Sequence, residues 1–198
     1  MSAATGKVRS RPMLRRSLML LVVPLATLAL GACGDKEERT LHAATEAEYV
    51  DVGPLKYQVQ ISRLLNPTST EDRAYLVDLP PGQDLGTDDE WFAVFMRVEN
   101  PTDSPQPVAD QYEIVDTEDN RYRPIQFGPK NAFVYRAGTV GAEQVLPLSD
   151  SPAGQNSIQG AMLLFKIPYK NLENRPLELR IPAPAGTTDE VGTIDLDV

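Results

Sequence analysis

Few side chains of this sequence could support nucleophilic or metal-centred chemistry. The chain of 198 residues contains one cysteine, Cys33, and one histidine, His42, against 28 acidic residues. A single cysteine excludes an internal disulfide and a cysteine-rich zinc site, and a single histidine excludes a metal cluster with two imidazoles. Because His42 lies in a polar stretch that is typical of a solvated linker, neither a Ser–His–Asp triad nor a Cys–His pair is expected.

The carboxylates form one compact group of possible metal ligands. Asp116, Glu118, Asp119 and Asn120 supply hard oxygen ligands within five residues, a pattern that suits Ca²⁺. The same residues are also typical of a solvated β-turn, and we favour that interpretation over a metal site. A hydrolase with two paired carboxylates, as in glycosidases, is the least favoured alternative.

Positive charge in the middle of the chain is concentrated beside aromatic residues. Arg121, Arg123, Lys130 and Arg136 form a candidate partner-binding surface, although we favour the interpretation that they are exposed strand positions that offset nearby acids. The net charge of −9 argues against nucleic acid as a partner, because neutralising phosphates requires a basic face. We expect no cofactor, since the chain has no P-loop and no dinucleotide-binding glycine motif.

The first 32 residues differ in charge from the rest of the chain. They contain five basic residues and no acidic one, and their thirteen-residue uncharged, mostly apolar stretch runs from Leu18 to Leu30. Thirteen helical residues span about 20 Å, less than the ~30 Å core of a bilayer, so a cleaved signal fits better than a permanent membrane span. The pair Arg15–Arg16 leaves twin-arginine export open as an alternative to general secretion.

The most specific motif follows this apolar stretch. Leu30, Gly31, Ala32 and Cys33 resemble the bacterial lipobox, in which the chain is cleaved before the cysteine and the cysteine is lipidated. The resemblance implies a lipoprotein signal peptide over 1–32 and a membrane anchor at Cys33. The alternative is that Cys33 is a small residue near an ordinary cleavage site. Removing the signal changes the net charge from −9 to −14, because five of the 19 basic residues are lost.

Two compositional segments follow the cysteine. Residues 33–52 are polar and rich in alanine, which predicts a flexible tether that could reach up to ~60 Å from the lipid surface. From residue 53 onward the dominant period is two, as in β-strands. Residues 55–64 alternate apolar and polar side chains, whereas residues 91–100 are apolar on both faces and need cover on both sides. Trp91 is therefore expected in a core rather than on a ligand-binding surface.

The remaining pattern predicts an all-β antiparallel sandwich over 53–198. A hairpin is predicted over 112–125, with Asp119 and Asn120 able to adopt the positive φ of a tight turn. An insertion at 66–90 carries a possible short strand at 74–79 and is the best candidate for a mobile or partner-facing loop. The other strand candidates are 131–136, 144–146, 157–168, 177–181 and 194–198.

Four stretches together resemble a known family. FAVFMRVENPTD, YEIVDTEDNRYRP, PAGQNSIQGAMLLFKIP and LELRI are similar to the immunoglobulin-like domain of bacterial extracytoplasmic lipoproteins, a fold shared with telokin and a small secreted mycobacterial antigen. The sequence departs from the family pattern at Asn120, where the family has glycine, and at Ala153, which separates Pro152 from Gly154. The resemblance implies an immunoglobulin-like sandwich outside the membrane and no agreed catalytic residues.

These observations favour a binding protein over an enzyme. We expect a lipid-anchored accessory protein at the extracytoplasmic face of the cell membrane, acting through an unidentified protein partner. The alternatives are an envelope lipoprotein that binds calcium or a small ligand and, least favoured, an envelope hydrolase that uses carboxylates.

Overall fold

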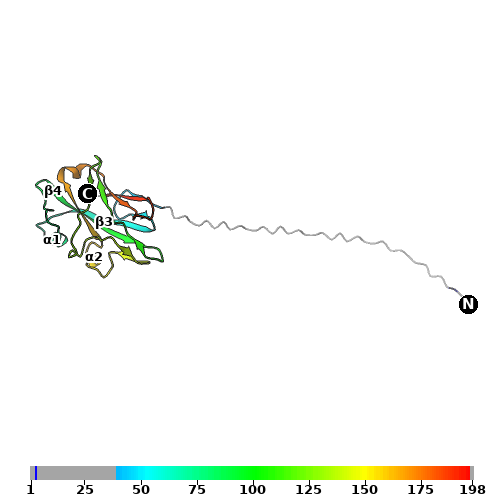
Figure 1. The fold of residues 1–198 in the computed structure, drawn as a ribbon. Helices are drawn as coiled ribbons and strands as arrows, with labels where there is room; N and C mark the ends of the chain where they lie inside the picture. Colours follow the sequence, from blue (N-terminus) through cyan, green and yellow to red (C-terminus); the bar gives the residue numbers. More distant parts are fainter. Residues whose placement is uncertain (1–2, 4–38, 197–198) are drawn as a thin grey trace. The chain divides into compact units, whose positions relative to one another are not determined.

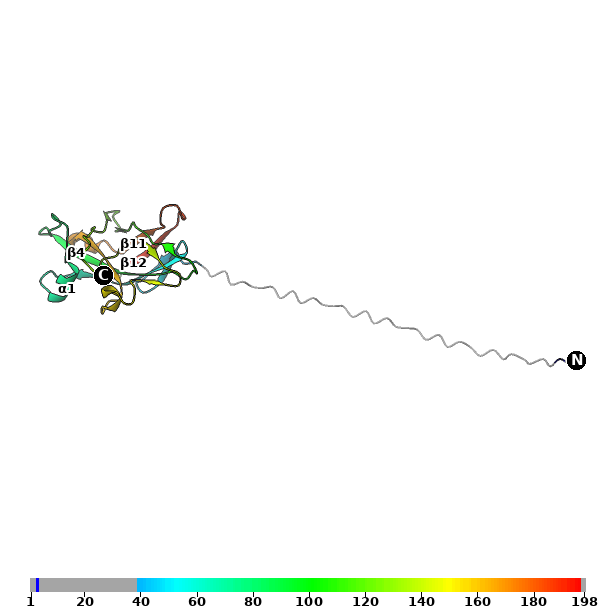
Figure 2. The same cartoon turned by 60° about the horizontal axis from the view of Figure 1, so that its bottom comes forward.

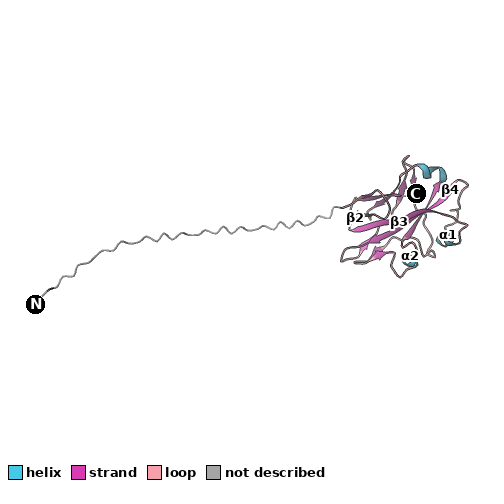
Figure 3. Cartoon of the chain, turned by 180° about the vertical axis from the view of Figure 1, so that it is seen from behind, coloured by secondary structure: helices cyan, strands magenta, loops and turns pink. Residues whose placement is uncertain are grey.

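The computed structural model describes Ala3 and residues 39–196 (Figure 1). The chain divides into two units, Met1–Lys36 and Glu37–Val198, and every described helix and strand lies in the second. Strands outnumber helices in this unit, and its helices are short (Figure 3). Among the described residues, no helix is long and apolar enough to cross a membrane.

Two sheets account for most of the strands. Sheet 1 has the order β10-β4-β3-β2, with β9 also paired to β4, and sheet 2 has the order β1-β12-β11-β6-β7. Neighbouring strands are antiparallel except β1 and β12, and β5 and β8 form a small third sheet. The strands of sheet 1 are β2 (Tyr49–Val52), β3 (Leu55–Leu65), β4 (Asp89–Glu99), β9 (Val145–Leu146) and β10 (Ala161–Pro168).

The shorter elements complete the inventory of the described part. The strands of sheet 2 are β1 (His42–Ala43), β6 (Glu113–Val115), β7 (Arg121–Tyr122), β11 (Leu177–Pro182) and β12 (Val191–Leu196). The third sheet joins β5 (Gln106–Pro107) to β8 (Thr139–Val140). The helical segments are α1 (Thr70–Tyr75), α2 (Pro152–Gln155) and the 3-10 helix η1 (Tyr169–Glu173). The predicted all-β antiparallel sandwich is confirmed, and Figure 2 shows the strands from a second direction.

Strand β4 has a hydrophobic core on each of its faces. Phe92, Val94, Met96 and Val98 belong to the main core, which also takes in the buried side chains of β11 and β12. Trp91, Ala93 and Phe95 belong to a second core on the opposite face of sheet 1. The alternation of the strand therefore requires cover on both sides, as its sequence predicts, and the expected burial of Trp91 is confirmed.

The insertion at 66–90 supplies part of the cover over the second core. Tyr75 is buried there, with its ring 5.1 Å from the Phe95 ring in an edge-on arrangement. The predicted strand over 74–79 is wrong, because helix α1 occupies 70–75 and turns follow it. Ser69 begins this helix by accepting a hydrogen bond from the Asp72 N–H at its side chain, the usual N-cap contact.

A partly buried ion pair links the insertion to sheet 1. The Arg63 Nη2 atom lies 2.6 Å from Asp72 Oδ1, and Asp72 Oδ2 accepts a hydrogen bond from the Asn66 N–H at 2.8 Å. The hydrogen bond from Arg63 lowers the pKa of the Asp72 carboxyl, against the opposing effect of burial. The insertion is thus packed and bonded onto the sheet at this end.

The segment before residue 53 corrects the predicted tether. Ala43, Val50 and Val52 are fully buried, and strand β2 is hydrogen-bonded to β3. Thr40 and Asp51 bond to each other twice, through Thr40 N–H to Asp51 Oδ2 and Asp51 N–H to Thr40 O. Residues 39–52 are therefore part of the sandwich, because their alternate apolar side chains fill its main core.

The hairpin and the weaker strand candidates have different outcomes. Strands β6 and β7 form the predicted hairpin, and the turn residue with positive φ is Asp119 (62°) rather than Asn120. The predicted strand over 131–136 is an irregular segment with one isolated parallel bridge, Val134 to Met162. Strand β9 lies within the predicted 144–146.

Candidate functional site

The outer face of sheet 2 is lined by polar and charged side chains. Strands β11 and β12 alternate buried apolar residues with partly exposed polar ones, so their apolar positions enter the main core. This alternation leaves Glu178, Arg180, Thr193 and Asp195 on the other face. Sheet 1 has a second core on its outer face, whereas sheet 2 presents this polar row.

Ion pairs organise the β6–β7 end of this face. Arg121 Nη1 lies 2.7 Å from Glu113 Oε2, and Arg123 Nε lies 3.6 Å from Glu113 Oε1. The Arg123 side chain is nevertheless 84% exposed. Both guanidinium groups therefore converge on the single carboxylate of Glu113, while the other acidic residues of the hairpin lie in its turn.

The other two residues of the predicted basic surface have different partners. Arg136 Nη2 donates to the carbonyl oxygens of Gly128 at 2.6 Å and Asn131 at 3.2 Å. The Lys130 backbone N–H donates to Asp78 Oδ2 at 3.0 Å. After β7 the chain passes to the edge of sheet 1, where the Ile125 N–H bonds the Leu164 carbonyl. The side chains of Arg121 and Arg123 therefore pair with Glu113 of sheet 2. Arg136 and the Lys130 backbone bond to loop segments instead.

The acidic turn is held by one buried carboxylate. Asp116 Oδ1 accepts hydrogen bonds from the N–H groups of Glu118 (2.9 Å) and Asn120 (3.0 Å). Its Oδ2 accepts from the side chains of Asn120 (2.9 Å), Tyr122 (3.1 Å) and Asn174 (3.1 Å). Five donors occupy the acceptor sites that a calcium ion would need, so Asp116 serves the turn and the 3-10 segment rather than a metal.

The same contacts set the ionisation of Asp116. Burial by itself would raise the pKa of this carboxyl, but the hydrogen bonds from Asn120, Asn174 and the turn N–H groups together lower it below its ordinary value. A lowered folded-state pKa means that the ionised carboxylate stabilises the fold above the unfolded pKa of about 3.9. This stabilisation is lost as the pH falls through the folded-state value.

Replacing Asp116 with asparagine is expected to lower the free energy of unfolding at pH 7 by about 2–4 kcal/mol, because an amide nitrogen cannot accept the bonds that Oδ2 accepts. Urea denaturation at pH 7 and pH 3 measures this difference, which should shrink at pH 3. The exposed Glu118→Gln is the control and should change stability little. An equal loss at both pH values would contradict the assigned role.

Two buried tyrosines bond to the backbone of Ala109, between β5 and β6, and a third, Tyr112, is buried nearby in the chain. Tyr57 OH accepts a hydrogen bond from the Ala109 N–H, and Tyr135 OH donates to the Ala109 carbonyl, both at 2.9 Å. Burial raises the pKa of Tyr57 to about 12 and raises the pKa values of Tyr112 and Tyr135 well above their ordinary range. These phenols therefore stay protonated at neutral pH and fix the chain between β5 and β6.

Two surface cavities lie outside sheet 2. One of about 670 Å³ is lined by both polar and apolar residues, among them Arg97, whose guanidinium lies 2.9 Å from Glu99. The other, of about 320 Å³, includes Tyr112, Phe127 and Arg136 in its wall. Arg136 donates hydrogen bonds to backbone carbonyls. In each cavity, the guanidinium group in the wall is therefore already bonded to another part of the protein.

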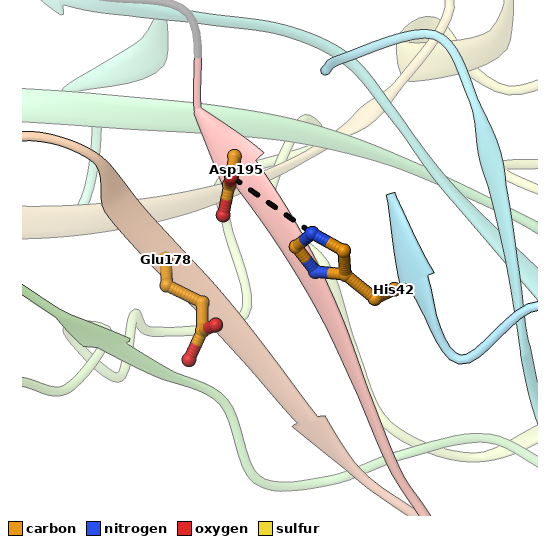
Figure 4. Close-up of side chains that lie close together, drawn as sticks. All are labelled: His42, Glu178 and Asp195. Carbon is orange, nitrogen blue, oxygen red and sulfur yellow. Dashed lines mark ion pairs between the residues drawn. The ribbon is translucent and has the colours of Figure 1, made fainter. Parts of the chain in front are cut away.

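The histidine belongs to the sandwich and not to a tether, contrary to the prediction. His42 is in strand β1, beside β12, with its side chain 54% exposed. Its Nε2 lies 4.0 Å from Asp195 Oδ2, and Glu178 on β11 completes a group whose ligand atoms are within 4.8 Å of one another (Figure 4). Sequence reasoning missed this group because β1 is distant in the chain from β11 and β12. The predicted cleavage and lipidation residues, Leu30, Gly31, Ala32 and Cys33, lie outside the described residues.

Comparison with known proteins supports the fold alone. No protein-family model matches the chain, and no curated protein matches it. The yjhA protein of Bacillus subtilis superposes with a TM-score of 0.51 at 12% identity, covering 78% of this chain and 99% of that one.

Two further solved structures are less similar. The ycdA protein of Bacillus subtilis, described as a putative lipoprotein, has a TM-score of 0.48 at 12% identity, and the match covers 75% of this chain. The match spans 38% of the ycdA chain. An uncharacterised β-sandwich protein of Clostridium difficile has a TM-score of 0.42 at 9% identity, covering 82% of this chain and 98% of that one.

Proposed function

We propose that this chain is a lipid-anchored extracytoplasmic protein that acts by binding another protein. The anchor in this proposal is Cys33, in the sequence Leu30–Cys33 that resembles a lipobox. The binding element is the outer face of sheet 2. We also propose that the sandwich is of the immunoglobulin-like type, in keeping with the motifs along β4, the β6–β7 hairpin, β10 and β11.

The length of chain between the anchor and the sandwich supports a position close to the membrane. Arg39 is already bonded to the sandwich, through an ion pair with Glu190 and a 2.6 Å hydrogen bond from its Nη2 to the Gly53 carbonyl. Six residue steps join Cys33 to Arg39, and six fully extended residues span about 20 Å. This limit replaces the ~60 Å expected for a tether that ends at residue 52.

A single observation carries the proposal of a binding face. The outer face of sheet 1 bears a second core built with the insertion, whereas the outer face of sheet 2 bears charged side chains held by ion pairs between β6 and β7 and within β11. Charged groups that are already fixed lose little side-chain freedom on binding, which favours recognition of a protein surface of complementary charge. The exposed Arg123, just after β7, is the basic group that would contact an acidic side chain of that partner.

Photo-crosslinking in the cells that make the protein tests this proposal. A photoreactive residue at position 123 should give one discrete adduct with a different protein, whereas the same residue at Val77, which is 49% exposed, should not. With the photoreactive residue kept at position 123, the reversal Arg121→Glu should reduce that adduct at least tenfold. A matched reversal of the exposed Arg73 to glutamate should leave it unchanged.

The contrary results are equally specific. Equal adducts from positions 123 and 77, or no adduct from position 123, would contradict a binding face on sheet 2. An adduct of twice the mass of this chain would show self-association instead of a distinct partner. Persistence of the adduct in the Arg121→Glu variant would contradict the proposed charge complementarity.

A further inference from the structure

We propose that His42, Glu178 and Asp195 form a binding site for a divalent metal ion of the zinc type on the outer face of sheet 2 (Figure 4). One imidazole nitrogen and two carboxylate oxygens lie within 4.8 Å of one another. Zinc holds such ligands at about 2.0–2.2 Å, and ligand atoms at a tetrahedral zinc lie about 3.4 Å apart. Side-chain rotation alone closes this gap, because the three residues are partly or fully exposed.

The register of the sheet places the two carboxylates against each other. Glu178 on β11 is directly opposite Asp195 on β12 in the antiparallel ladder, so their side chains share one face. Like charges directly opposite in a sheet destabilise it. Arg180 Nε, at 2.6 Å from Glu178 Oε1, offsets part of this repulsion. A bound cation between the two carboxylates would remove the rest.

The histidine is oriented as a ligand would be. Its Nδ1 lies 2.9 Å from Thr193 Oγ1, while its Nε2 faces Asp195. When Nδ1–H donates to that hydroxyl, Nε2 keeps the lone pair that binds a metal. Metal-binding histidines almost always use their second nitrogen in this way, which fixes both the tautomer and the ring.

The ligand set also selects the kind of ion. An imidazole favours zinc and neighbouring transition metals, whereas calcium and magnesium prefer oxygen alone. Three protein ligands leave at least one coordination position for water or for a group from another molecule. Since the side chain of His42 is 54% exposed, that position opens to solvent.

Titration of the full chain, purified without a polyhistidine tag, with ZnCl₂ tests this site. His42 is the only histidine of the sequence, so its ring gives one set of NMR signals. One equivalent of Zn²⁺ should shift the Nε2 resonance, and calorimetry should give a stoichiometry of one. We expect His42→Gln to abolish binding, Asp195→Asn to weaken it at least tenfold, and Thr193→Val to weaken it by about tenfold.

Controls separate this site from general attraction of cations to an acidic protein. Asp189→Asn removes an exposed carboxylate just before β12 and should leave Zn²⁺ affinity unchanged. An unshifted Nε2 resonance, or equal stabilisation by Ca²⁺ and Zn²⁺, would overturn the proposal. Unaltered Zn²⁺ affinity in His42→Gln would do the same. The test uses no partner and no membrane, so it is independent of the proposed protein binding.

Discussion

Replacing Phe95 with alanine should lower the free energy of unfolding by about 3–5 kcal/mol. Phe95 is fully buried in the second core, where its ring meets Tyr75 of the insertion. The substitution removes a large apolar side chain and leaves a cavity beneath helix α1, which the rigid sheet cannot fill. Urea denaturation measures the loss, and hydrogen exchange of the α1 amides should quicken because their packing partner is gone.

The neighbouring residue provides the matched control. Phe92 is also fully buried, but it enters the main core on the opposite face of β4. Phe92→Ala should cause a similar loss of global stability without selectively increasing exchange in α1. The exposed Val77→Ala should change stability by less than about 0.5 kcal/mol. A loss below about 1 kcal/mol for Phe95→Ala would show that the second core contributes little.

The two-faced packing around Phe95 could be predicted because its signal is local. The run from Trp91 to Val98 alternates two apolar sets, and a strand of this kind is stable only between two covering layers. What the pattern cannot specify is which segment provides the second layer. Helix α1 has only six residues, too few to be stable on its own. The packing of Tyr75 and the Arg63–Asp72 ion pair hold it in place.

The N-terminal boundary was missed for a related reason. Strands β1 and β2 have two and four residues, too few for alternation to distinguish them from a polar linker. Their stability comes from pairing with β12 and β3, which no local pattern reveals. The group around His42 was missed with them, because it exists only once β1 lies beside β12.

The acidic turn shows what residue types alone can predict and what they cannot. Its composition correctly indicated a turn, and oxygen-rich side chains also suggested calcium. The choice between these roles depends on donors outside the turn, including Asn174, 58 residues further along the chain. A sequence motif does not show which hydrogen-bond donors the tertiary structure brings to a carboxylate. The role of Asp116 as a hydrogen-bond acceptor is therefore evident only from the fold.

Replacing Cys33 with serine should abolish lipidation of the protein. The proposed thioether needs the cysteine sulfur, and a serine hydroxyl does not substitute for it. Metabolic labelling with a fatty-acid analogue should therefore mark the natural chain and leave Cys33→Ser unlabelled. Cleavage between Ala32 and residue 33 should also stop, so that the variant keeps the mass of the chain with its first 32 residues.

The adjacent position separates lipidation from export in general. Gly34→Ala leaves Leu30 to Cys33 intact and should be labelled and cleaved like the natural chain. Because a single acyl chain binds a membrane with a constant of only about 10⁴ M⁻¹, stable retention of the natural protein in the membrane fraction implies more than one chain. Fatty-acid label on Cys33→Ser, or its absence from the natural chain, would contradict the anchor. With the anchor removed, the ~20 Å limit between lipid and sandwich would no longer hold.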